Sequence, residues 1–456
     1  MGAIFVALFA LLALRQFWLQ VVEGPAIAAR PNNPRHAAAA VGRGSILASD
    51  GRPLAISHGA TRRYPQGALL AQAVGYASAR YGTSGLEDAF DRVLSAHADA
   101  VDPVSQVRDI LAGSHRTPRG ADIVTTLDLR VQNALVAGLS RYARAAGVAL
   151  DPRTGAVLAL ASVPSYDPNR LDALWPALLK DPTKPLIDRS TGGLYPPGST
   201  FKIVTASDAL DAGVITPQST FSDDGGLRVG NFTVHNDEEE ATGTQDLAGA
   251  FALSSNVDFA QIALKLGVRS WFDYATRWGL GHDVEFDTPV ARDRLPAEPD
   301  VSQSILAQLG FGQASLLVTP MRMALIGATI ADDGTTPRPY LVRRIAGSET
   351  ALATRSETIA QPISAETAHE VRDLMIEVVK RGTGTAARLP DVTVAGKTGT
   401  ATNPHGRSHA WFVAFAPAEN PRVAVAVVVE NIGYGGTYAA PIAREVLRVA
   451  LGRPRS

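Results

Sequence analysis

The 456-residue sequence contains no cysteine. Disulfide bridges, thiolate nucleophiles and cysteine-ligated zinc sites are therefore excluded. An excess of charge of either sign is also missing, because 43 basic and 44 acidic residues leave a formal net charge of −1. We therefore expect no nucleic acid among the partners of the protein. The length favours two or three domains, and the apolar content is sufficient for a large core.

Metal and cofactor motifs are equally scarce. The nine histidines include no H-E-x-x-H motif. The acidic run Asp237–Glu240 lacks the spacing of a cation site, so we interpret it as a solvated face. Gly382–Ala387 matches the loose pattern of a dinucleotide-binding loop, but it follows a predicted helix instead of a strand. Gly433–Gly436 is interpreted as a flexible turn on the same ground. We predict that the protein uses neither a metal nor a cofactor.

The amino terminus carries an apolar stretch that is short for a membrane span. Gly2–Leu14 is unbroken, and Phe17–Val22 extends it beyond Arg15 and Gln16. The uncharged part is shorter than the ~20 residues that a spanning helix needs. We favour residues 1–22 as an uncleaved single-pass anchor shortened by a wrong start assignment, with the rest of the chain outside the cytoplasm. A cleaved signal peptide and a buried helix of a soluble protein are the alternatives.

Lysine is rare, and its few positions are informative. The chain has six lysines, at positions 180, 184, 202, 265, 380 and 397. Two of them fall in a three-part motif: Ser199–Lys202 has the form S-x-x-K, Ser254–Asn256 has the form S-x-N, and Lys397–Thr400 reads K-T-G-T. The first motif alone is a weak signal. All three in this order indicate an enzyme that forms an acyl-serine intermediate.

The first motif has the chemistry of an activated serine. Ser199 follows the turn residues Pro196–Gly198 and opens a predicted helix that runs to Leu210. A serine in that place is often only a helix N-cap. Lys202, however, projects from the same helical face, and a buried neutral lysine can take the proton of a serine hydroxyl. Arginine cannot do so, because it stays protonated. We therefore predict Ser199 as the nucleophile and Lys202 as its base.

The pattern of apolar residues predicts a small mixed amino-terminal domain over residues 23–146 and a larger domain over residues 147–456. Residues 221–244 are interpreted as a loop. Strands are predicted at Ile123–Thr126, Gly147–Leu150, Ala156–Val163, Val392–Thr402, His409–Ala416 and Arg422–Glu430. Helices are predicted at Leu129–Ala145, Ser199–Leu210, Leu247–Leu253, Val257–Leu266, Thr319–Ile330, Ala365–Val379 and Pro441–Leu451. This order predicts an α+β domain with one mainly antiparallel sheet, covered by helices on both faces.

The three motifs together resemble those of the penicillin-recognising acyl-serine transferases. Further segments resemble the high-molecular-weight, class B (monofunctional) penicillin-binding proteins of actinobacterial type: Gly120–Asp122, Thr125–Asp128, Gln132, Leu150–Leu160, Pro164–Asn169, Gly310–Gln313, Val318–Pro320, Gly382–Gly384 and His409–Phe412. The resemblance extends from about Arg43 to Leu451. This sequence departs from the family pattern in two features, the short amino-terminal apolar run and the Ser-Ser-Asn form of the second motif. The resemblance implies the penicillin-recognising serine transferase fold, with the amino-terminal domain as a pedestal or dimerisation domain.

The resemblance implies a peptidoglycan D,D-transpeptidase that acts in cell-wall synthesis during growth or division. Ser199 would attack the carbonyl between the last two D-alanines of a stem peptide while Lys202 accepts its proton. Ser254 would relay that proton to the leaving amine. Asn256 would orient the amide of the donor peptide and help to hold Lys202. The side-chain amine of a second stem peptide would then resolve the ester and form the cross-link.

The third motif would bind the end of the donor peptide. Lys397 would supply a positive charge, and Thr398 and Thr400 hydroxyls, to the terminal carboxylate. Lys397 is also the candidate cation that, together with burial, lowers the pKa of the base. Gly399 would let the substrate backbone approach the strand edge, since it has no side chain. The oxyanion would lie between the backbone N–H groups of Ser199 and Thr400.

The resemblance also implies partners and leaves alternatives open. β-Lactams would mimic the D-Ala-D-Ala end and acylate Ser199. A SEDS glycosyltransferase and proteins of division or elongation are the implied partners, together with the membrane. A D,D-carboxypeptidase or a serine β-lactamase is the alternative among enzymes, although no Glu-x-x-x-Asn follows the second motif to supply a base for deacylation. A non-catalytic scaffold or β-lactam receptor is the other alternative, against which the complete motifs speak.

Overall fold

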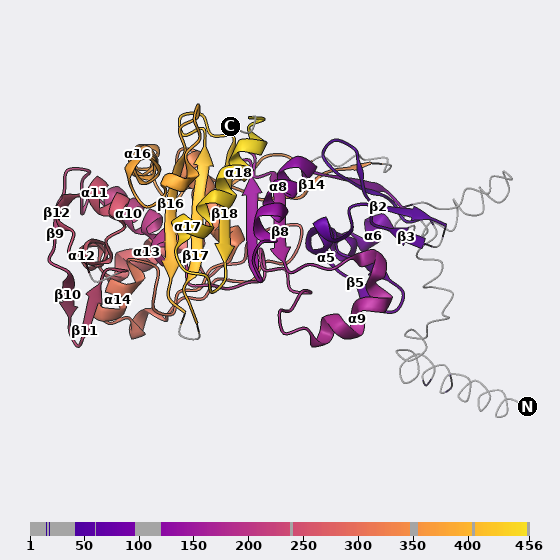
Figure 1. Ribbon diagram of the computed structural model, residues 1–456, viewed down its shortest axis with the longest axis horizontal. Coiled ribbons are helices and arrows are strands. Elements are labelled where there is room, and N and C mark those ends of the chain that lie inside the picture. Colours follow the sequence, from indigo (N-terminus) through magenta and orange to yellow (C-terminus); the bar gives the residue numbers. More distant parts are fainter. Residues whose placement is uncertain are drawn as a thin grey trace, which may run out of the picture.

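The computed structural model describes residues 42–59, 61–95, 120–237, 240–346, 354–403 and 406–453, together with the single residues 15 and 18. The molecule is elongated, with a sheet in the middle, helices at one end and a smaller part at the other (Figure 1). The expected anchor and linker lie outside the described residues, apart from residues 15 and 18. No helix in the described part of the chain is long and apolar enough to cross a membrane.

The central sheet has five strands and is antiparallel throughout. These strands are β7 (Ala145–Leu150), β8 (Val157–Val163), β16 (Ala395–Ala401), β17 (His409–Ala416) and β18 (Val423–Val429). Their order across the sheet is β16-β17-β18-β7-β8, so β16 is an edge strand. All residues of β17 and β18 are buried, which requires cover on both faces of the sheet. The predicted antiparallel sheet is confirmed, with strand ends that differ by up to three residues.

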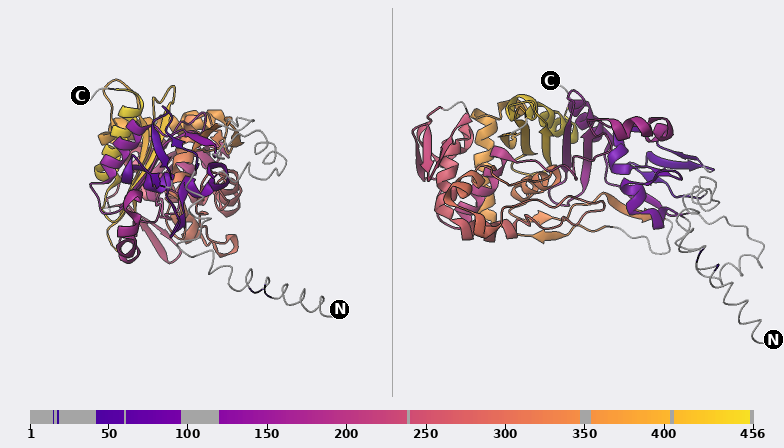
Figure 2. Two further views of the ribbon diagram at one scale, coloured as in Figure 1. Left: turned by 90° about the vertical axis from the view of Figure 1, so that its right-hand side faces the viewer. Right: turned by 90° about the horizontal axis from the view of Figure 1, so that it is seen from below.

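Helices provide that cover on both faces. On one face lie α8 (Leu129–Leu139) and α18 (Ala440–Ala450), whereas α15 (Pro320–Ala331) covers the other and α16 (Ala365–Arg381) packs beside β16. Successive residues of β18 alternate between the two layers: Val425 packs with the first pair of helices and Ala426 with the core beneath α15. This alternation follows from the two-residue period of a strand. The sheet is therefore the middle layer of three, as Figures 1 and 2 show.

A helical region lies at the β16 side of the sheet (Figure 1). Its helices are α10 (Lys202–Asp211), α11 (Leu247–Leu253), α12 (Asn256–Leu266), α13 (Val268–Arg277) and α14 (Gln303–Leu309). The segment 221–244, expected to be a loop, instead contributes two antiparallel strand pairs. They are formed by β9 (Thr220–Asp223) with β12 (Gly243–Asp246), and by β10 (Gly226–Val229) with β11 (Phe232–His235). These strands are short and largely exposed, so the sequence carries no apolar run to reveal them.

The amino-terminal part is built around a second five-stranded sheet. Its strands are β1 (Ile46–Leu47), β2 (Pro53–His58), β3 (Thr61–Arg63), β6 (Asp122–Thr125) and β14 (Val342–Ala346), in the order β14-β6-β1-β2-β3. Strand β14 comes from far along the chain, and α8, expected in the amino-terminal domain, packs against the central sheet. The boundary expected between residues 146 and 147 therefore does not separate the two parts in space.

The remaining elements include several that lie between these two parts. They are α4 (Ala71–Val74), β4 (Ala77–Ser78), β5 (Gly82–Thr83), α5 (Gly85–Ala89), α6 (Asp91–Leu94), α9 (Leu171–Lys180), β13 (Thr336–Pro337), β15 (Thr358–Ala360) and α17 (Gly435–Tyr438). Asn169 exchanges two hydrogen bonds of 2.9 Å with the backbone of Tyr64. Trp175 on α9 stacks on Tyr81, with 4.4 Å between the ring centroids. Specific contacts thus hold the amino-terminal part against the rest of the molecule.

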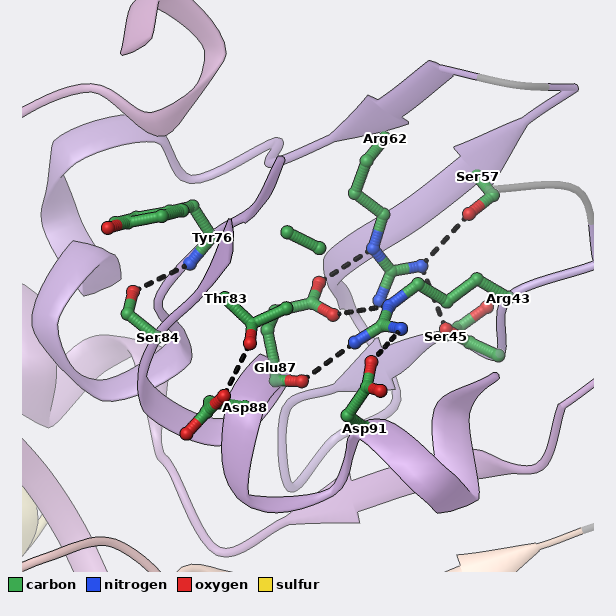
Figure 3. A network of polar contacts seen from close by, with 12 residues as sticks. Arg43, Ser45, Ser57, Arg62, Tyr76, Thr83, Ser84, Glu87, Asp88 and Asp91 are labelled. Carbon is green, nitrogen blue, oxygen red and sulfur yellow. Dashed lines mark hydrogen bonds and ion pairs between the residues drawn. The ribbon is translucent and has the colours of Figure 1, made fainter. Parts of the chain in front are cut away.

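A buried ion-pair network holds the amino-terminal part together (Figure 3). The Glu87 carboxylate on α5 is 0% exposed and accepts hydrogen bonds from Arg43 Nε at 2.7 Å and Arg62 Nε at 2.6 Å. Tyr64 donates a third, at 3.3 Å. Arg43 also pairs with the half-exposed Asp91 at 2.6 Å. One carboxylate therefore ties the start of the described chain, strand β3 and helix α5 to one another.

We expect Glu87→Gln to destabilise this part of the molecule strongly. The substitution leaves two buried guanidinium groups without their shared counter-ion, which typically costs about 3–5 kcal/mol. Urea unfolding followed by hydrogen exchange in β1 and β2 measures the effect. Asp50→Asn is the matched control, because it removes the exposed pair with Arg52, worth about 0–1 kcal/mol. Equal stability of the two variants would contradict the assigned role of Glu87.

Candidate active site

The segment around Ser199 is a tight turn pressed against the edge of the central sheet. Residues Gly198–Phe201 form a 3₁₀ turn, and α10 begins only at Lys202, so the predicted helix starts later than expected. Gly198 has φ +54°, and its N–H donates to the Gly312 carbonyl at 2.9 Å. A Cβ at Gly198 would lie 3.0 Å from the Thr400 carbonyl oxygen, which leaves no room for a side chain. The turn is thereby fixed beside the third motif.

Trp411 on β17 and Glu430, directly after β18, anchor the approach to this turn. Trp411 Nε1 donates to the Pro196 carbonyl at 3.0 Å. The Tyr195 hydroxyl donates to Glu430 Oε1 at 2.8 Å, and the same carboxylate pairs with Arg189 at 2.9 Å. Neither Glu430 nor Arg189 belongs to a recognisable motif. Their contacts join segments more than 200 residues apart, so they arise only in the folded protein.

The second motif lies at the junction of two helices and faces the first lysine. Ser254 ends α11 in the left-handed region, with φ +65° and ψ +38°. In this conformation Lys202 Nζ donates both to the Ser254 carbonyl at 2.5 Å and to its hydroxyl oxygen at 3.2 Å. Lys202 also donates to Asn256 Oδ1 at 2.9 Å. The strained backbone of Ser254 therefore serves to turn two oxygens toward one ammonium group.

The third motif brings a second lysine to the same hydroxyl. Lys397 lies on the edge strand β16, and its Nζ donates to Ser254 Oγ at 2.7 Å and to the Thr398 carbonyl at 3.2 Å. Both lysine side chains are 0% exposed, and each lies over a phenylalanine ring of the helical region. Residues separated by 195 positions in the chain, Lys202 and Lys397, thus share one serine hydroxyl as a partner.

These groups form the floor and wall of one cleft of about 730 Å³. Four predicted residues line it: Ser199, Ser254, Thr398 and Thr400. The two lysines lie beneath its surface. Further lining residues, which the sequence analysis did not assign to the site, are Asn236, Asp237, Glu240, Ala241, Thr242, Leu253, Ser255, Thr383, Thr385, Ala386 and Tyr434–Thr437. A sequence signal for several of them is the pair of glycine-rich segments Gly382–Ala387 and Gly433–Gly436, which we interpret above as a dinucleotide-like pattern without its structural context and as a flexible turn.

Two expectations for the site need correction. Asp237 and Glu240 are exposed as predicted, but they line the cleft and are not simply part of a solvated face. Gly399 has a packing role besides the one expected of it: a Cβ there would lie 3.0 Å from the Pro197 carbonyl oxygen, so the missing side chain admits the turn that carries Ser199. The helix expected to start at Ser199 begins at Lys202, and no hydrogen bond joins the Ser199 hydroxyl to Lys202 in the described structure.

The described residues contain no cluster of three or more histidine, aspartate or glutamate side chains that could hold a metal ion. The chemistry of the cleft is instead that of hydroxyl groups, two lysines and backbone N–H groups. A serine that lines a cleft, with buried amines next to a second serine, can form and break an acyl ester.

Comparison with known proteins agrees with this geometry. A family model described as the penicillin binding protein transpeptidase domain matches residues 145–448. The chain belongs to the penicillin-binding protein transpeptidase family. A second model, described as the penicillin binding protein A dimerisation domain, matches residues 43–123.

Relatives of this penicillin-binding protein cover nearly all of its length. The peptidoglycan D,D-transpeptidase PbpA of Mycobacterium tuberculosis is 35% identical over 486 aligned residues, which span 98% of this chain and 97% of that protein. The peptidoglycan D,D-transpeptidase MrdA of Escherichia coli is 31% identical and spans 85% and 70%. The solved structure of penicillin-binding protein A from M. tuberculosis, as a ceftriaxone acyl-enzyme complex, has a TM-score of 0.84 and 33% identity over 91% of this chain and 100% of that one. The resemblance inferred from the motifs is confirmed.

Burial controls the proton affinity of both lysines in this penicillin-binding protein. Desolvation lowers the pKa of Lys202 to about 7, although the charges of Asp237, Asp258 and Asp223 oppose the shift. Desolvation, followed by repulsion from Lys202, lowers the pKa of Lys397 well below its ordinary value. We expect burial and the charge of Lys397 together to lower the pKa of Lys202. Burial is the cause of that shift, whereas the repulsion between the two lysines lowers the pKa of Lys397.

We expect acylation of the serine to require neutral Lys202 and to rise with pH. A pKa of about 7 leaves about one-tenth of Lys202 neutral at pH 6 and about nine-tenths at pH 8. The second-order rate constant for acylation by a penicillin should therefore increase through neutral pH and then level off. Lys202→Arg, which stays protonated, should not be acylated at any of these pH values. A rate constant independent of pH across this range in the wild-type protein would contradict the role of Lys202.

Proposed function

We propose that this protein is a peptidoglycan D,D-transpeptidase that cross-links stem peptides through an ester of Ser199. The observation that carries the proposal is the shared hydroxyl of Ser254, which joins the two buried lysines directly beneath a cleft that Ser199 lines. Relatives named peptidoglycan D,D-transpeptidase, which align over most of the chain, support the same assignment. β-Lactams are the expected inhibitors, in line with the acyl-enzyme complex of the mycobacterial relative.

In the acylation step Ser199 Oγ forms a bond to the carbonyl carbon between the last two D-alanines. Its proton passes to neutral Lys202, which follows it on the next helical turn. The negative charge that develops on the carbonyl oxygen would be held by the backbone N–H groups of Ser199 and Thr400. The C–N bond then breaks, and the leaving amine receives the proton from Lys202 through the Ser254 hydroxyl. D-Alanine leaves, and the donor peptide remains esterified.

The edge strand β16 is the expected binding site of the donor peptide. An edge strand presents unpaired backbone groups, to which an extended peptide can add as a further strand. The side chains of Thr398 and Thr400 line the cleft at this edge. Their hydroxyls and the buried charge shared by the two lysines would hold the terminal carboxylate of D-alanine. The terminal carboxylate thus places the reacting carbonyl next to Ser199.

In the second step an amine of another stem peptide attacks the ester carbon. Lys202 again accepts the proton, the bond to Ser199 Oγ breaks, and the serine recovers its proton. Hydrolysis of the same ester, as in a D,D-carboxypeptidase or β-lactamase, is the second candidate. One observation favours keeping it: the carboxylates of Asp237 and Glu240 line the cleft and can bind or activate water. The lifetime of the acyl-enzyme distinguishes the two functions.

We further propose that residues 1–22 anchor the protein in the membrane, with the catalytic domain outside the cytoplasm. The apolar run Gly2–Leu14 supports this proposal. Residues 23–146 would form the pedestal or dimerisation domain, in agreement with the family model that matches residues 43–123. A SEDS glycosyltransferase and division or elongation proteins are the proposed partners. This part of the proposal rests on the resemblance to class B penicillin-binding proteins.

We expect penicillin G to form one lasting covalent adduct with the protein and none with Ser199→Ala. Intact-mass spectrometry of both proteins after incubation measures this directly. The adduct should persist, because no Glu-x-x-x-Asn segment follows the second motif to supply a base for deacylation by water. Rapid loss of the adduct, with accumulation of hydrolysed penicillin, would instead identify a β-lactamase. A wild-type protein that forms no adduct would exclude Ser199 as the nucleophile.

A further inference from the structure

Asp223 is a buried carboxylate behind the second motif that has no cationic partner among the described residues. It ends β9 and is 0% exposed. Four neutral donors meet its two oxygens: the Gly225 N–H at 2.9 Å, Asn236 Nδ2 at 2.6 Å, Thr242 Oγ1 at 2.6 Å and Ser255 Oγ at 3.0 Å. Three of these bonds reach Oδ2 and one reaches Oδ1, so both oxygens of the carboxylate are engaged. Burial favours the neutral acid, but these four bonds hold the pKa of Asp223 below its ordinary value.

The first of two connections to the active site is Ser255, the middle residue of the second motif. Its hydroxyl donates to Asp223 and accepts from the Asp258 N–H at 3.0 Å, which makes it the N-cap of α12. A hydroxyl group can donate in one direction and accept in the other, as this position requires. Although Ser255 contributes to the lining of the cleft, it is only 1% exposed and its hydroxyl is occupied by these two protein partners. This accounts for the Ser-Ser-Asn form of the motif, which the resemblance left unexplained.

The second connection is Asn236, which follows β11. Its amide oxygen accepts from the N–H groups of Asn256 at 2.7 Å and Val257 at 3.3 Å. Its amide nitrogen donates to Asp223 and to the Glu240 carbonyl at 2.8 Å. Because an ionised Asp223 can only accept, it forces the nitrogen toward itself and the oxygen toward the backbone of Asn256. The carboxylate therefore selects one of the two orientations of the amide.

Both connections end at Asn256, which touches the catalytic base. Its side-chain nitrogen donates to the His235 carbonyl at 3.1 Å, and its side-chain oxygen accepts from Lys202 Nζ at 2.9 Å. The backbone and the side chain of Asn256 are thus both held by residues 235–236. That segment in turn is bound to Asp223.

We propose that Asp223 is a positioning residue for acyl transfer, which orients the Asn236 amide and the Ser255 hydroxyl and through them fixes Asn256 against Lys202. It acts through these neighbours and does not itself line the cleft. The inference rests on the proposed function, because Lys202 is taken as the base. It adds a residue from outside the three motifs to the machinery of the reaction.

The charge of Asp223 provides a readout that a purely structural role would not change. The charged groups that act on Lys202 are Asp237, Asp258 and Asp223, which raise its pKa against the effect of burial. Lys397 is the other charged group that contacts the same serine. Replacing Asp223 with a neutral residue removes one of the negative charges that raise the pKa of Lys202, so this pKa should fall. The base would then be neutral, and acylation would begin, at lower pH than in the wild-type protein.

The experiment compares the full-length wild-type protein with Asp223→Asn, using the rate constant for acylation by penicillin G as a function of pH. The amide of the variant keeps one acceptor oxygen and replaces the other with an NH2 group, so at least one of the four donors meets another donor and that contact becomes repulsive. We expect the plateau rate constant to fall by about 10- to 100-fold, the effect of a small displacement of a catalytic group. We also expect the rising limb of the profile to move to lower pH.

Asp287→Asn is the matched control. Asp287 is a partly buried carboxylate that accepts the N–H groups of Leu341 at 2.5 Å and Val342 at 2.8 Å, outside the cleft. Its replacement should leave both the plateau and the pH limb of acylation unchanged in the folded protein. A folded Asp223→Asn protein with the wild-type plateau and limb would overturn the inference.

Ser255→Ala covers the case in which Asp223→Asn does not fold. It removes one of the four hydrogen bonds to Asp223 and keeps the charge, so we expect a lower plateau with an unchanged pH limb. A folded Ser255→Ala protein with the wild-type plateau would also overturn the inference. If the wild-type protein itself forms no adduct, the proposed function fails and this inference fails with it. An acylated wild-type protein with unaffected variants contradicts the inference alone.

Discussion

Two buried lysine side chains converge on the hydroxyl group of Ser254, and much of the surrounding structure holds these three side chains in place. Lys202 and Lys397 are both fully buried. Removing an ammonium group from water is costly unless hydrogen bonds replace its hydration. For Lys202, Ser254 in its left-handed conformation supplies a carbonyl and a hydroxyl oxygen, and Asn256 supplies a third oxygen. The same burial lowers the proton affinity of the lysines, which is the property that a base for a serine hydroxyl requires.

The two lysines can meet only because the helical region and the central sheet are held at a fixed distance. Lys202 belongs to the helical region, whereas Lys397 lies on the edge strand β16. Glycines at positions 198 and 399 let the turn Gly198–Phe201, which carries Ser199, pack directly on that strand. The sheet behind it is covered by helices on both faces, so the edge is supported by a packed core. The precision of the site therefore depends on packing that extends well beyond the three motifs.

Two buried carboxylates outside the three motifs, Glu87 and Asp223, also hold segments of the chain together. In the amino-terminal part, Glu87 joins two arginines in a buried network, and β14 ties that part to the chain that continues into α16. In the helical region, Asp223 gathers four neutral donors behind Ser255. In both places one buried carboxylate organises segments that are distant in the sequence, because an ion in the interior must be surrounded by partners.

The sequence alone identified the family and predicted a nucleophile and its base, because the three short motifs and their order can be recognised without the fold. It also determined the central strands and the helices α12, α15, α16 and α18, whose apolar periods are strong. Only the tertiary structure decided what depends on contacts between distant segments. The strand pairs of residues 220–246 are polar and non-local, and β14 joins a sheet whose other strands precede it by more than 200 residues. The repulsion that lowers the pKa of Lys397, the packing role of Gly399 and the hydrogen bonds around Asp223 likewise depend on burial and three-dimensional neighbours, which no local pattern in the chain records.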